Sequence, residues 1–395
     1  MAKEKKEKVV RRSIDMDAVV AAKYAKKNHN PVKIIFKVLF YLVLVLLLAA
    51  AGYIGYYSIT AMNRIDDDRV LAVAGEPAVK MAELKKTYTI ATQNIGFGAY
   101  SPNFTFFMDN GEKARAESEK MVRDNTKRFT DTIAEYNPDI VLVQEVDTKA
   151  TRSWNVNQYE LLQNTFSDCN SSFAQNAHFG YLLYPFNEPM GAVESGIATF
   201  SKISMPASTR ISVPVSDGYK QFMDLDRCFT KSRIVVENGT DLVVYNVHFS
   251  AYGAEASVRS NQFSKLINDM TKEMEDGNFC IAGGDFNADF TGTSATDLNA
   301  AGVTKPEWAQ PLAVTTLPQG ITKVTNYSGK ETVATCRNAD IPLSEKSFLV
   351  ILDGFIVSKD VEVVSVENVD TKFAYSDHNP VVMKFKLNGE EFSID

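Results

Sequence analysis

An uncharged apolar run near the N-terminus constrains the fold of this 395-residue chain more than any other feature. The run extends from Val38 to Ile59 and reads VLFYLVLVLLLAAAGYIGYYSI. At about 1.5 Å per helical residue, it is long enough to cross a hydrocarbon core of roughly 30 Å. Tyrosines stand near both of its ends, where aromatic side chains favour the membrane–water interface. We therefore expect one N-terminal transmembrane helix over residues 38–59.

The distribution of charge predicts how this helix is oriented. Residues 1–37 carry an excess of seven positive charges, and since the whole chain has a net charge of −7, the remainder carries an excess of fourteen negative charges. Basic flanks stay in the cytoplasm. This predicts a basic cytoplasmic leader (residues 1–37), a membrane-proximal spacer (60–86) and an extracellular domain (87–395). The protein would then be a single-pass protein of the cell membrane, with its N-terminus in the cytoplasm.

Two other interpretations of the apolar run remain open. A buried core helix is disfavoured, because such a helix normally shows a polar face. A cleaved signal peptide is the stronger alternative, because the segment Ala49-Ala50-Ala51-Gly52 resembles a small-residue cleavage site.

From about Thr87 onward, short β-branched and apolar runs are separated by turn residues, a pattern typical of buried strands. The predicted strands are 87–95, 139–146, 195–201, 241–249, 279–286, 348–358 and 379–387. Apolar residues at helical spacing predict helices over Glu112–Tyr136 and about Ala256–Glu275. Strands mixed with helices predict a layered α/β domain.

Polar side chains end or interrupt these strands. They are Asn94, Gln144, Glu145, Asn246, His248, Asp285, Asn287, Asp353, Asp377 and His378. Burying such groups is costly unless they are paired or bind something. Carboxylates are hard ligands for Mg²⁺ or Mn²⁺, and imidazoles titrate near neutrality. The set is therefore suited to metal-assisted acid–base chemistry at a shared rim of the sheets.

Read in order, seven short motifs resemble the endonuclease/exonuclease/phosphatase superfamily. They are NI (94–95), QEV (144–146), SGIATFSK (195–202), NVHFS (246–250), GGDFNAD (283–289), ILDGFIVS (351–358) and SDHNPV (376–381). This superfamily includes pancreatic-type deoxyribonuclease, abasic-site endonucleases, neutral sphingomyelinases and inositol polyphosphate 5-phosphatases. The resemblance implies a two-sheet four-layer α/β sandwich with helices outside and the site at one edge of the sheets.

The resemblance also implies a divalent metal, Mg²⁺ or Mn²⁺. Glu145 would be its principal ligand, helped by Asn94, and Asp377 would lie beside the metal. The chain departs from the abasic-site endonuclease pattern at one metal ligand, because Gly96 stands where those enzymes have an acidic residue.

The remaining matched residues would act on the phosphate and the water. Asp285 and Asn287 would orient or deprotonate the attacking water and hold the scissile phosphate. Asp353 would fix the tautomer of His378, which would be the general base or a phosphate-binding imidazole. His248 would stabilise the phosphate or protonate the leaving group, as in the deoxyribonuclease and sphingomyelinase branches. Which group is the general base stays open.

These features predict a membrane-anchored, extracytoplasmic, divalent-metal-dependent phosphodiester hydrolase, with a deoxyribonuclease-like endonuclease favoured. The acidic charge counts against it, because nonspecific duplex binding relies on Lys and Arg. The alternative is a sphingomyelinase-like phosphoesterase acting on phospholipids or small molecules, although no exposed aromatic hairpin is evident. A third possibility is a non-catalytic surface binding protein. The expected partners are a nucleic-acid or phospholipid substrate and the membrane, and no obligate protein partner is inferred.

Arginines and cysteines add two weaker expectations. Candidate phosphate contacts are Arg152, Arg227, Arg233, Arg259 and Arg337. Outside the cytoplasm, Cys169 and Cys228 could form a disulfide, whereas Cys280 in a predicted strand is expected to be a buried thiol.

Overall fold

The computed structural model describes residues 15–23, 31–62, 65, 68–216, 226–251, 256–312 and 317–390. Much of the predicted leader, residues 1–14 and 24–30, lies outside these described residues. The chain divides into two compact units, Met1–Gly55 and Tyr56–Asp395. The first unit contains the short helix α1 (Met16–Lys23) and most of the long helix α2 (Pro31–Met62).

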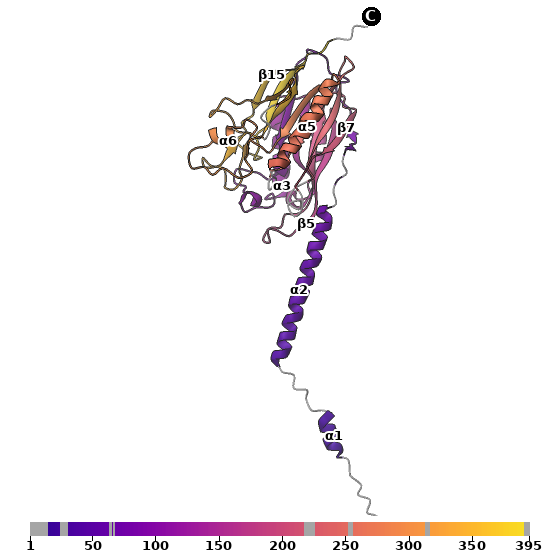
Figure 1. The fold of residues 1–395 in the computed structure, drawn as a ribbon, viewed down its shortest axis with the longest axis vertical. Helices are drawn as coiled ribbons and strands as arrows, with labels where there is room; N and C mark the ends of the chain where they lie inside the picture. Colours follow the sequence, from indigo (N-terminus) through magenta and orange to yellow (C-terminus); the bar gives the residue numbers. More distant parts are fainter. Residues whose placement is uncertain are drawn as a thin grey trace, which may run out of the picture. The chain divides into compact units, whose positions relative to one another are not determined.

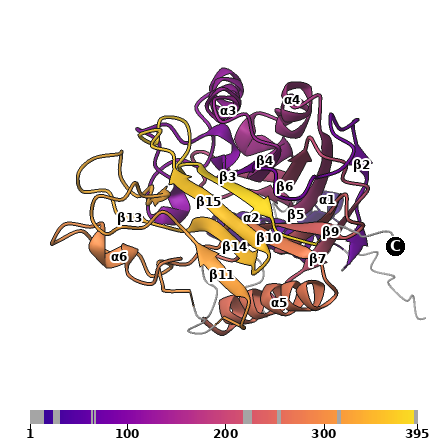
Figure 2. The same cartoon turned by 90° about the horizontal axis from the view of Figure 1, so that it is seen from above.

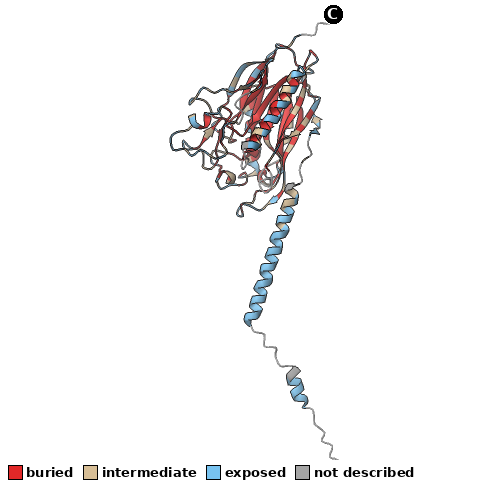
Figure 3. Ribbon diagram, in the orientation of Figure 1, coloured by how far each residue is buried: buried red, intermediate tan, exposed pale blue. Residues whose placement is uncertain are grey.

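Helix α2 contains the predicted apolar run and extends beyond it at both ends. It begins at Pro31, a residue tolerated in the first turn because the N–H that it lacks has no helical partner there. The segment Pro31–Thr60 is long and apolar enough to cross a membrane, and its most apolar window is wholly exposed (Figure 3). The structure thus contains one candidate membrane span among its described residues.

Two seven-stranded mixed sheets form the second unit (Figure 1). The first sheet contains, in spatial order, β1 (Arg69–Val70), β7 (Ala207–Ser212), β8 (Cys228–Val235), β9 (Asp241–His248), β10 (Phe279–Asp285), β14 (Asp353–Ser358) and β11 (Ile321–Val324). The second contains β15 (Val361–Asn368), β16 (Val381–Leu387), β3 (Tyr88–Asn94), β4 (Ile140–Ala150), β6 (Gly191–Ser201), β5 (Asn170–Leu182) and β2 (Val73–Ala74). A separate pair joins β12 (Cys336–Arg337) to β13 (Leu349–Val350).

Helices cover the outer faces of the two sheets. Helices α3 (Glu119–Ala134) and α4 (Gln158–Thr165) lie on one side, and α5 (Ala256–Glu275) lies on the other (Figure 2). The sheets pack against each other through a buried cluster that includes Leu142 of β4 and Ile281 of β10. Short turns of helix complete the fold: η1 (Gly96–Gly98), η2 (Phe107–Asp109), η3 (Thr151–Ser153) and α6 (Ser294–Asp297). This arrangement confirms the predicted two-sheet α/β sandwich.

Strands β5, β7, β8, β11 and β15 and helix α4 were not predicted, and other elements differ in their bounds. The predicted helix from Glu112 begins only at Glu119, because Ser118 caps it by accepting a hydrogen bond from the Met121 N–H. The predicted strand 348–358 is divided into β13 and β14, because the N–H groups of Leu352 and Asp353 both donate to Thr335 Oγ1. Within the predicted spacer 60–86, β1 and β2 add edge strands to the two sheets.

The suggested disulfide between Cys169 and Cys228 is wrong. All four cysteines are free and buried. Cys169 packs in the cluster beneath α3 and α4, whereas Cys228 belongs to a different cluster with Ala174 and Ile197. Burial raises the pKa of Cys280 to about 12, in agreement with the expected buried thiol.

Candidate active site

The register of the strands brings the predicted catalytic residues to one level of the first sheet. Strand β10 is parallel to β9 and antiparallel to β14, so Asp285 lies opposite His248 on one side and opposite Asp353 on the other. In the second sheet, the parallel strands β3 and β4 place Asn94 opposite Gln144, next to Glu145. Both sheets therefore bring polar residues to the same edge of the sandwich.

A bulge in β4 presents Glu145 to the site. The pairing of β4 with β6 shifts between Val143 and Val146, and Glu145 has a φ of 55°, in the left-handed region. Bulges of this kind redirect a side chain and are frequent beside active sites. The Glu145 side chain keeps 26% of its surface exposed, against 1% for Asp285. The bulge therefore places one carboxylate where a ligand could reach it.

Asn94 joins the two sheets at the site. Its amide nitrogen donates to Glu145 Oε1 at 3.2 Å and to Asp285 Oδ2 at 3.1 Å. Its amide oxygen accepts from the Gly96 N–H at 2.9 Å. A Cβ at Gly96 would lie 2.9 Å from Asp377 Oδ1 and would also clash with Tyr100, at a residue with a φ of 50°. Gly96, which stands where abasic-site endonucleases have an acidic residue, thus leaves the space that the Asp377 side chain occupies.

His378 is oriented by a carboxylate. Its Nδ1 lies 2.8 Å from Asp353 Oδ2, and its Nε2 lies 3.8 Å from Asp285 Oδ2. Ser376 Oγ accepts from the His378 N–H at 3.1 Å and donates to the Asn94 carbonyl at 2.8 Å. Burial lowers the pKa of His378, but the Asp353 carboxylate, with contributions from Cys336 and Asp285, outweighs it and holds the pKa well above its usual value.

His248 has the opposite electrostatic environment. Its Nε2 lies 3.7 Å from Asp285 Oδ2 and 3.9 Å from Glu145 Oε1. Burial, and then the nearby positive charge of Arg227, hold the pKa of His248 well below its usual value. The Nδ1 atom of this ring is buried, and no described residue hydrogen-bonds to it. The two histidines beside Asp285 are therefore biased toward different protonation states.

The donor set fits a divalent cation. Burial raises the pKa of Asp285, and Asp353 raises it further. Burial, with a contribution from Glu145, raises the pKa of Asp377 to about 7. Both raised pKa values come mainly from burial, with a smaller contribution from a neighbouring carboxylate, and a bound cation would stabilise the ionised forms. The ligand atoms of Asp285, Asp353 and His378 all lie within 4.8 Å of one another, although Asp353 is engaged with the histidine ring.

These residues open into a cavity of about 370 Å³. Seven of the eight predicted site residues line it: Asn94, Glu145, His248, Asp285, Asn287, Asp377 and His378. Asp353 lies behind His378, as expected for an orienting acid. Asn287 is held there by hydrogen bonds from its backbone N–H to Asp285 Oδ1 and from its amide to the Phe249 carbonyl, both at 2.8 Å.

The predicted phosphate contacts separate into two groups. Arg152, Arg227 and Arg337 line the cavity. Arg152 is engaged by Asp147 in a two-point ion pair at 2.9 and 3.0 Å. Arg233 instead pairs with Asp241 and Glu273, and Arg259 donates to the Ala251 carbonyl. Neither Arg233 nor Arg259 is among the residues that line the cavity.

Two polar residues grouped with the site have a structural role. The Gln144 amide nitrogen donates to Asn246 Oδ1 at 2.7 Å, and Asn246 in turn donates to the Ala198 carbonyl at 2.8 Å. The two side chains thus connect the sheets inside the core. Sequence reasoning missed Ser376 and Thr335, whose hydroxyls hold the loop of His378 and the start of β14. The serine next to Asp377 and His378 was the available signal.

Comparison with known proteins identifies the family. The profile of the Endonuclease/Exonuclease/phosphatase family matches residues 91–378. The chain therefore belongs to this family, whose members hydrolyse phosphodiester or phosphate-ester bonds. A search of curated proteins finds no significant match.

Several solved structures are similar to this chain. The chain is similar to an endonuclease/exonuclease/phosphatase protein from Beutenbergia cavernae, with a TM-score of 0.50 and 15% identity over 77% of this chain and 72% of that chain. It is also similar to one from Bacteroides vulgatus (TM-score 0.48, 17% identity, 77% and 100% covered). A third is the human Nocturnin catalytic domain with bound sulfate (TM-score 0.47, 16% identity, 80% and 97% covered).

Proposed function

We propose that the chain is a membrane-anchored, extracytoplasmic, divalent-metal-dependent phosphodiester hydrolase. One observation carries the proposal: four carboxylates and two histidines converge from both sheets at one site, and all but one of them line its cavity. They are Glu145, Asp285, Asp353, Asp377, His248 and His378. A purely structural role would not require so many ionisable groups around one cavity, and the pKa values of Asp285, Asp377, His248 and His378 are shifted from their usual values.

Glu145 and Asp377 would hold Mg²⁺ or Mn²⁺, because they combine an accessible carboxylate with a second carboxylate that lines the same cavity. Asn94 would assist by holding Glu145 Oε1 through its amide nitrogen. When bound, the cation would neutralise charge on the phosphate oxygens. The amide of Asn94 bridges Glu145 and Asp285, so it couples the metal ligands to the group that faces the water.

The other side chains have roles that follow from their positions. Asp285 lies between the two histidines and accepts the proton of the attacking water. His378, oriented by Asp353, presents Nε2 to the phosphate oxygens. His248 lies on the other side of Asp285, where its imidazole would stabilise or protonate the leaving oxygen. Asn287 holds the phosphate beside Asp285.

The membrane part of the proposal is supported by α2 and by charge. The apolar segment of α2 is long enough to span a bilayer. The excess of basic residues before it favours a cytoplasmic N-terminus and an extracellular catalytic domain.

A substrate panel tests the proposed function. The full chain, purified in detergent, is assayed with Mg²⁺ or Mn²⁺ on DNA, sphingomyelin and bis-p-nitrophenyl phosphate. Metal-dependent turnover of any of these supports a hydrolase, and turnover of DNA would favour the deoxyribonuclease-like endonuclease predicted from the sequence. No turnover of all three by the wild-type chain would favour the surface binding protein.

A further inference from the structure

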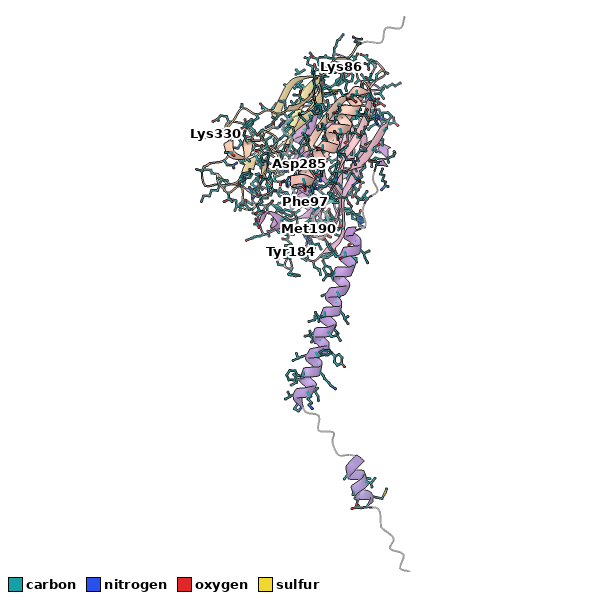
Figure 4. All side chains as sticks on the ribbon, in the orientation of Figure 1. Lys86, Phe97, Tyr184, Met190, Asp285 and Lys330 are labelled. Carbon is teal, nitrogen blue, oxygen red and sulfur yellow. The ribbon has the colours of Figure 1, made fainter. Side chains whose placement is uncertain are left out.

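The cavity beside the catalytic cluster has a predominantly apolar surface. Beyond the polar groups, β5 contributes Phe179 and Leu182, the start of β6 contributes Val193, and Met190 lies just before it. In Figure 4, Asp285, Phe97, Met190 and Tyr184 follow one another toward one end of the domain, while Lys86 lies at the opposite end. The cavity therefore extends from Asp285 to apolar side chains that a phosphate group alone would not contact favourably.

This lining favours a hydrocarbon over a polynucleotide. Each methylene that such a surface removes from water favours binding by about three- to fourfold. A nucleic acid would need several free cations along its backbone. Three arginines line the cavity, of which Arg152 is engaged by Asp147 and Arg337 donates to the Ser101 and Phe104 carbonyls. The carboxylates of Asp109 and Asp226 line the same space as these arginines and Arg227.

The loop between β5 and β6, residues 183–190, exposes aromatic side chains. Phe186 is 84% exposed, and Tyr184 is 56% exposed. The ring of Tyr184 lies 5.8 Å from that of Phe107, which lines the cavity, and 6.0 Å from that of Phe186. Exposed aromatic residues on a loop favour the membrane interface. No exposed aromatic hairpin was evident in the sequence, whereas in the structure the loop between β5 and β6 exposes Tyr184 and Phe186.

The same hairpin contacts the last two turns of α2. The Tyr181 N–H donates to Tyr56 Oη and the Gly180 N–H donates to Thr60 Oγ1, both at 3.3 Å. A Cβ at Gly180 would lie 2.6 Å from Thr60 Oγ1, so this close approach requires glycine. Tyr57 itself lines the cavity. The end of the apolar helix, the aromatic loop and the cavity thus meet within the second unit.

We propose that the substrate is a hydrocarbon-bearing phosphoester taken from the membrane that anchors α2. Its phosphate lies at the catalytic cluster, its hydrocarbon lies in the cavity, and the 183–190 loop contacts the bilayer surface. This inference rests on the proposed phosphoester hydrolysis and names its substrate class.

A series of p-nitrophenyl alkyl phosphodiesters tests the cavity. The full chain is assayed in detergent below the aggregation limit of each compound, with methyl, butyl and octyl chains. We expect kcat/KM to rise by about threefold per methylene until the cavity is filled. In Leu182→Asn the rise becomes shallower, whereas in Val364→Asn, on the exposed face of β15, it does not change. Turnover that is independent of chain length overturns the inference but leaves the proposed function intact. No turnover of the methyl compound overturns the proposed function itself.

A vesicle assay tests the source of the substrate. The full chain is reconstituted into phosphatidylcholine vesicles that contain sphingomyelin, and the release of the headgroup is compared with turnover of the soluble methyl diester. We expect Phe186→Ser to lower the ratio of lipid to soluble turnover by about tenfold, and the matched surface variant Val364→Ser to leave it unchanged. If neither vesicle lipid is hydrolysed while the soluble diester is, a membrane lipid is not the substrate. An unchanged ratio in Phe186→Ser would show that the 183–190 loop does not contribute to the turnover of membrane lipid.

Discussion

The second unit contains two buried clusters of charged side chains with different electrostatics. On the outer face of the first sheet, Glu273 of α5 accepts from Lys231 and Arg233 of β8, each at 2.6 Å, and from Asn278 at 2.7 Å. We call these four residues the paired cluster. Burial raises the pKa of Glu273, but the hydrogen bonds outweigh it, so the pKa lies below its usual value. At the sheet edge, by contrast, the pKa values of Asp285 and Asp377 are raised.

The difference separates a stabilising cluster from the cluster that we propose to be functional. Each carboxylate oxygen of Glu273 has a cation or an amide as its partner, so its charge is compensated within the fold. At the active site, carboxylates from both sheets lie near one another and share two histidines. Charge that the fold leaves uncompensated is available to a metal and a substrate. Substitutions in the two clusters should therefore affect different properties.

The largest expected effect is the loss of turnover in the active site. We expect Glu145→Ala and His378→Ala each to lower kcat/KM by at least about a thousandfold, because in the proposed site the first removes a metal ligand and the second removes the imidazole that would face the phosphate. The free energy of unfolding should change by less than about 1 kcal/mol in Glu145→Ala, whose side chain is partly exposed. Steady-state kinetics and denaturant titration measure the two quantities. Retained activity in either variant contradicts the site assignment.

A smaller loss is expected when only the orientation of His378 is disturbed. Asp353→Asn keeps the size of the side chain but removes the charge that holds His378 Nδ1 at 2.8 Å. We expect kcat to fall by about a hundredfold with little change in KM, because Asp353 does not line the cavity. NMR of the ring nitrogens should show a lower pKa for His378. An unchanged histidine titration would mean that Asp353 does not control it.

A substitution in the paired cluster should lower the stability of the fold and leave turnover nearly unchanged. We expect Glu273→Ala to lower the free energy of unfolding by about 2 kcal/mol, since it leaves Lys231 and the half-exposed Arg233 without this carboxylate. Turnover at saturating substrate should stay within about twofold of wild type, because the cluster lies outside the cavity. Unfolding in denaturant and kinetics on the same preparation provide the check. A loss of activity without a loss of stability would remove the distinction between the clusters.

The smallest effect concerns pH. Because the folded pKa of Glu273 is lowered from the ordinary value of 4.5, its contribution to stability is present above that value and is lost as pH falls through the folded pKa. The difference in unfolding free energy between wild type and Glu273→Ala should therefore shrink between about pH 6 and about pH 3. A difference that is constant across this range would show that the ion pairs do not lower the pKa of Glu273.

The sequence predicted the elements that carry the site because their signals are local. A buried strand such as β10 is a short apolar run, and Asp285 stands at its end, where the run stops. Polar residues at several strand ends indicated a common rim, and the strand register places them there. The resemblance rested on the order of seven motifs along the chain, and this order cannot be read from any single apolar run.

Other features depended on contacts between distant residues and could not be predicted from local patterns. The orientation of Glu145 requires a bulge that is visible only in the pairing of β4 with β6. Strand β5 alternates polar and apolar residues with interruptions, so its period was not evident until it paired with β6. The cavity is lined by residues from Tyr57 to His378, and only the fold brings them together.

The most direct test of the central claim is metal-dependent release of p-nitrophenol from bis-p-nitrophenyl phosphate by the full chain. We predict turnover with Mg²⁺ or Mn²⁺ that stops on addition of EDTA, returns when the metal is restored, and is absent in His378→Ala. Turnover that persists in EDTA, or that is equal in wild type and His378→Ala, would contradict a metal-dependent phosphoesterase site at this edge of the sheets.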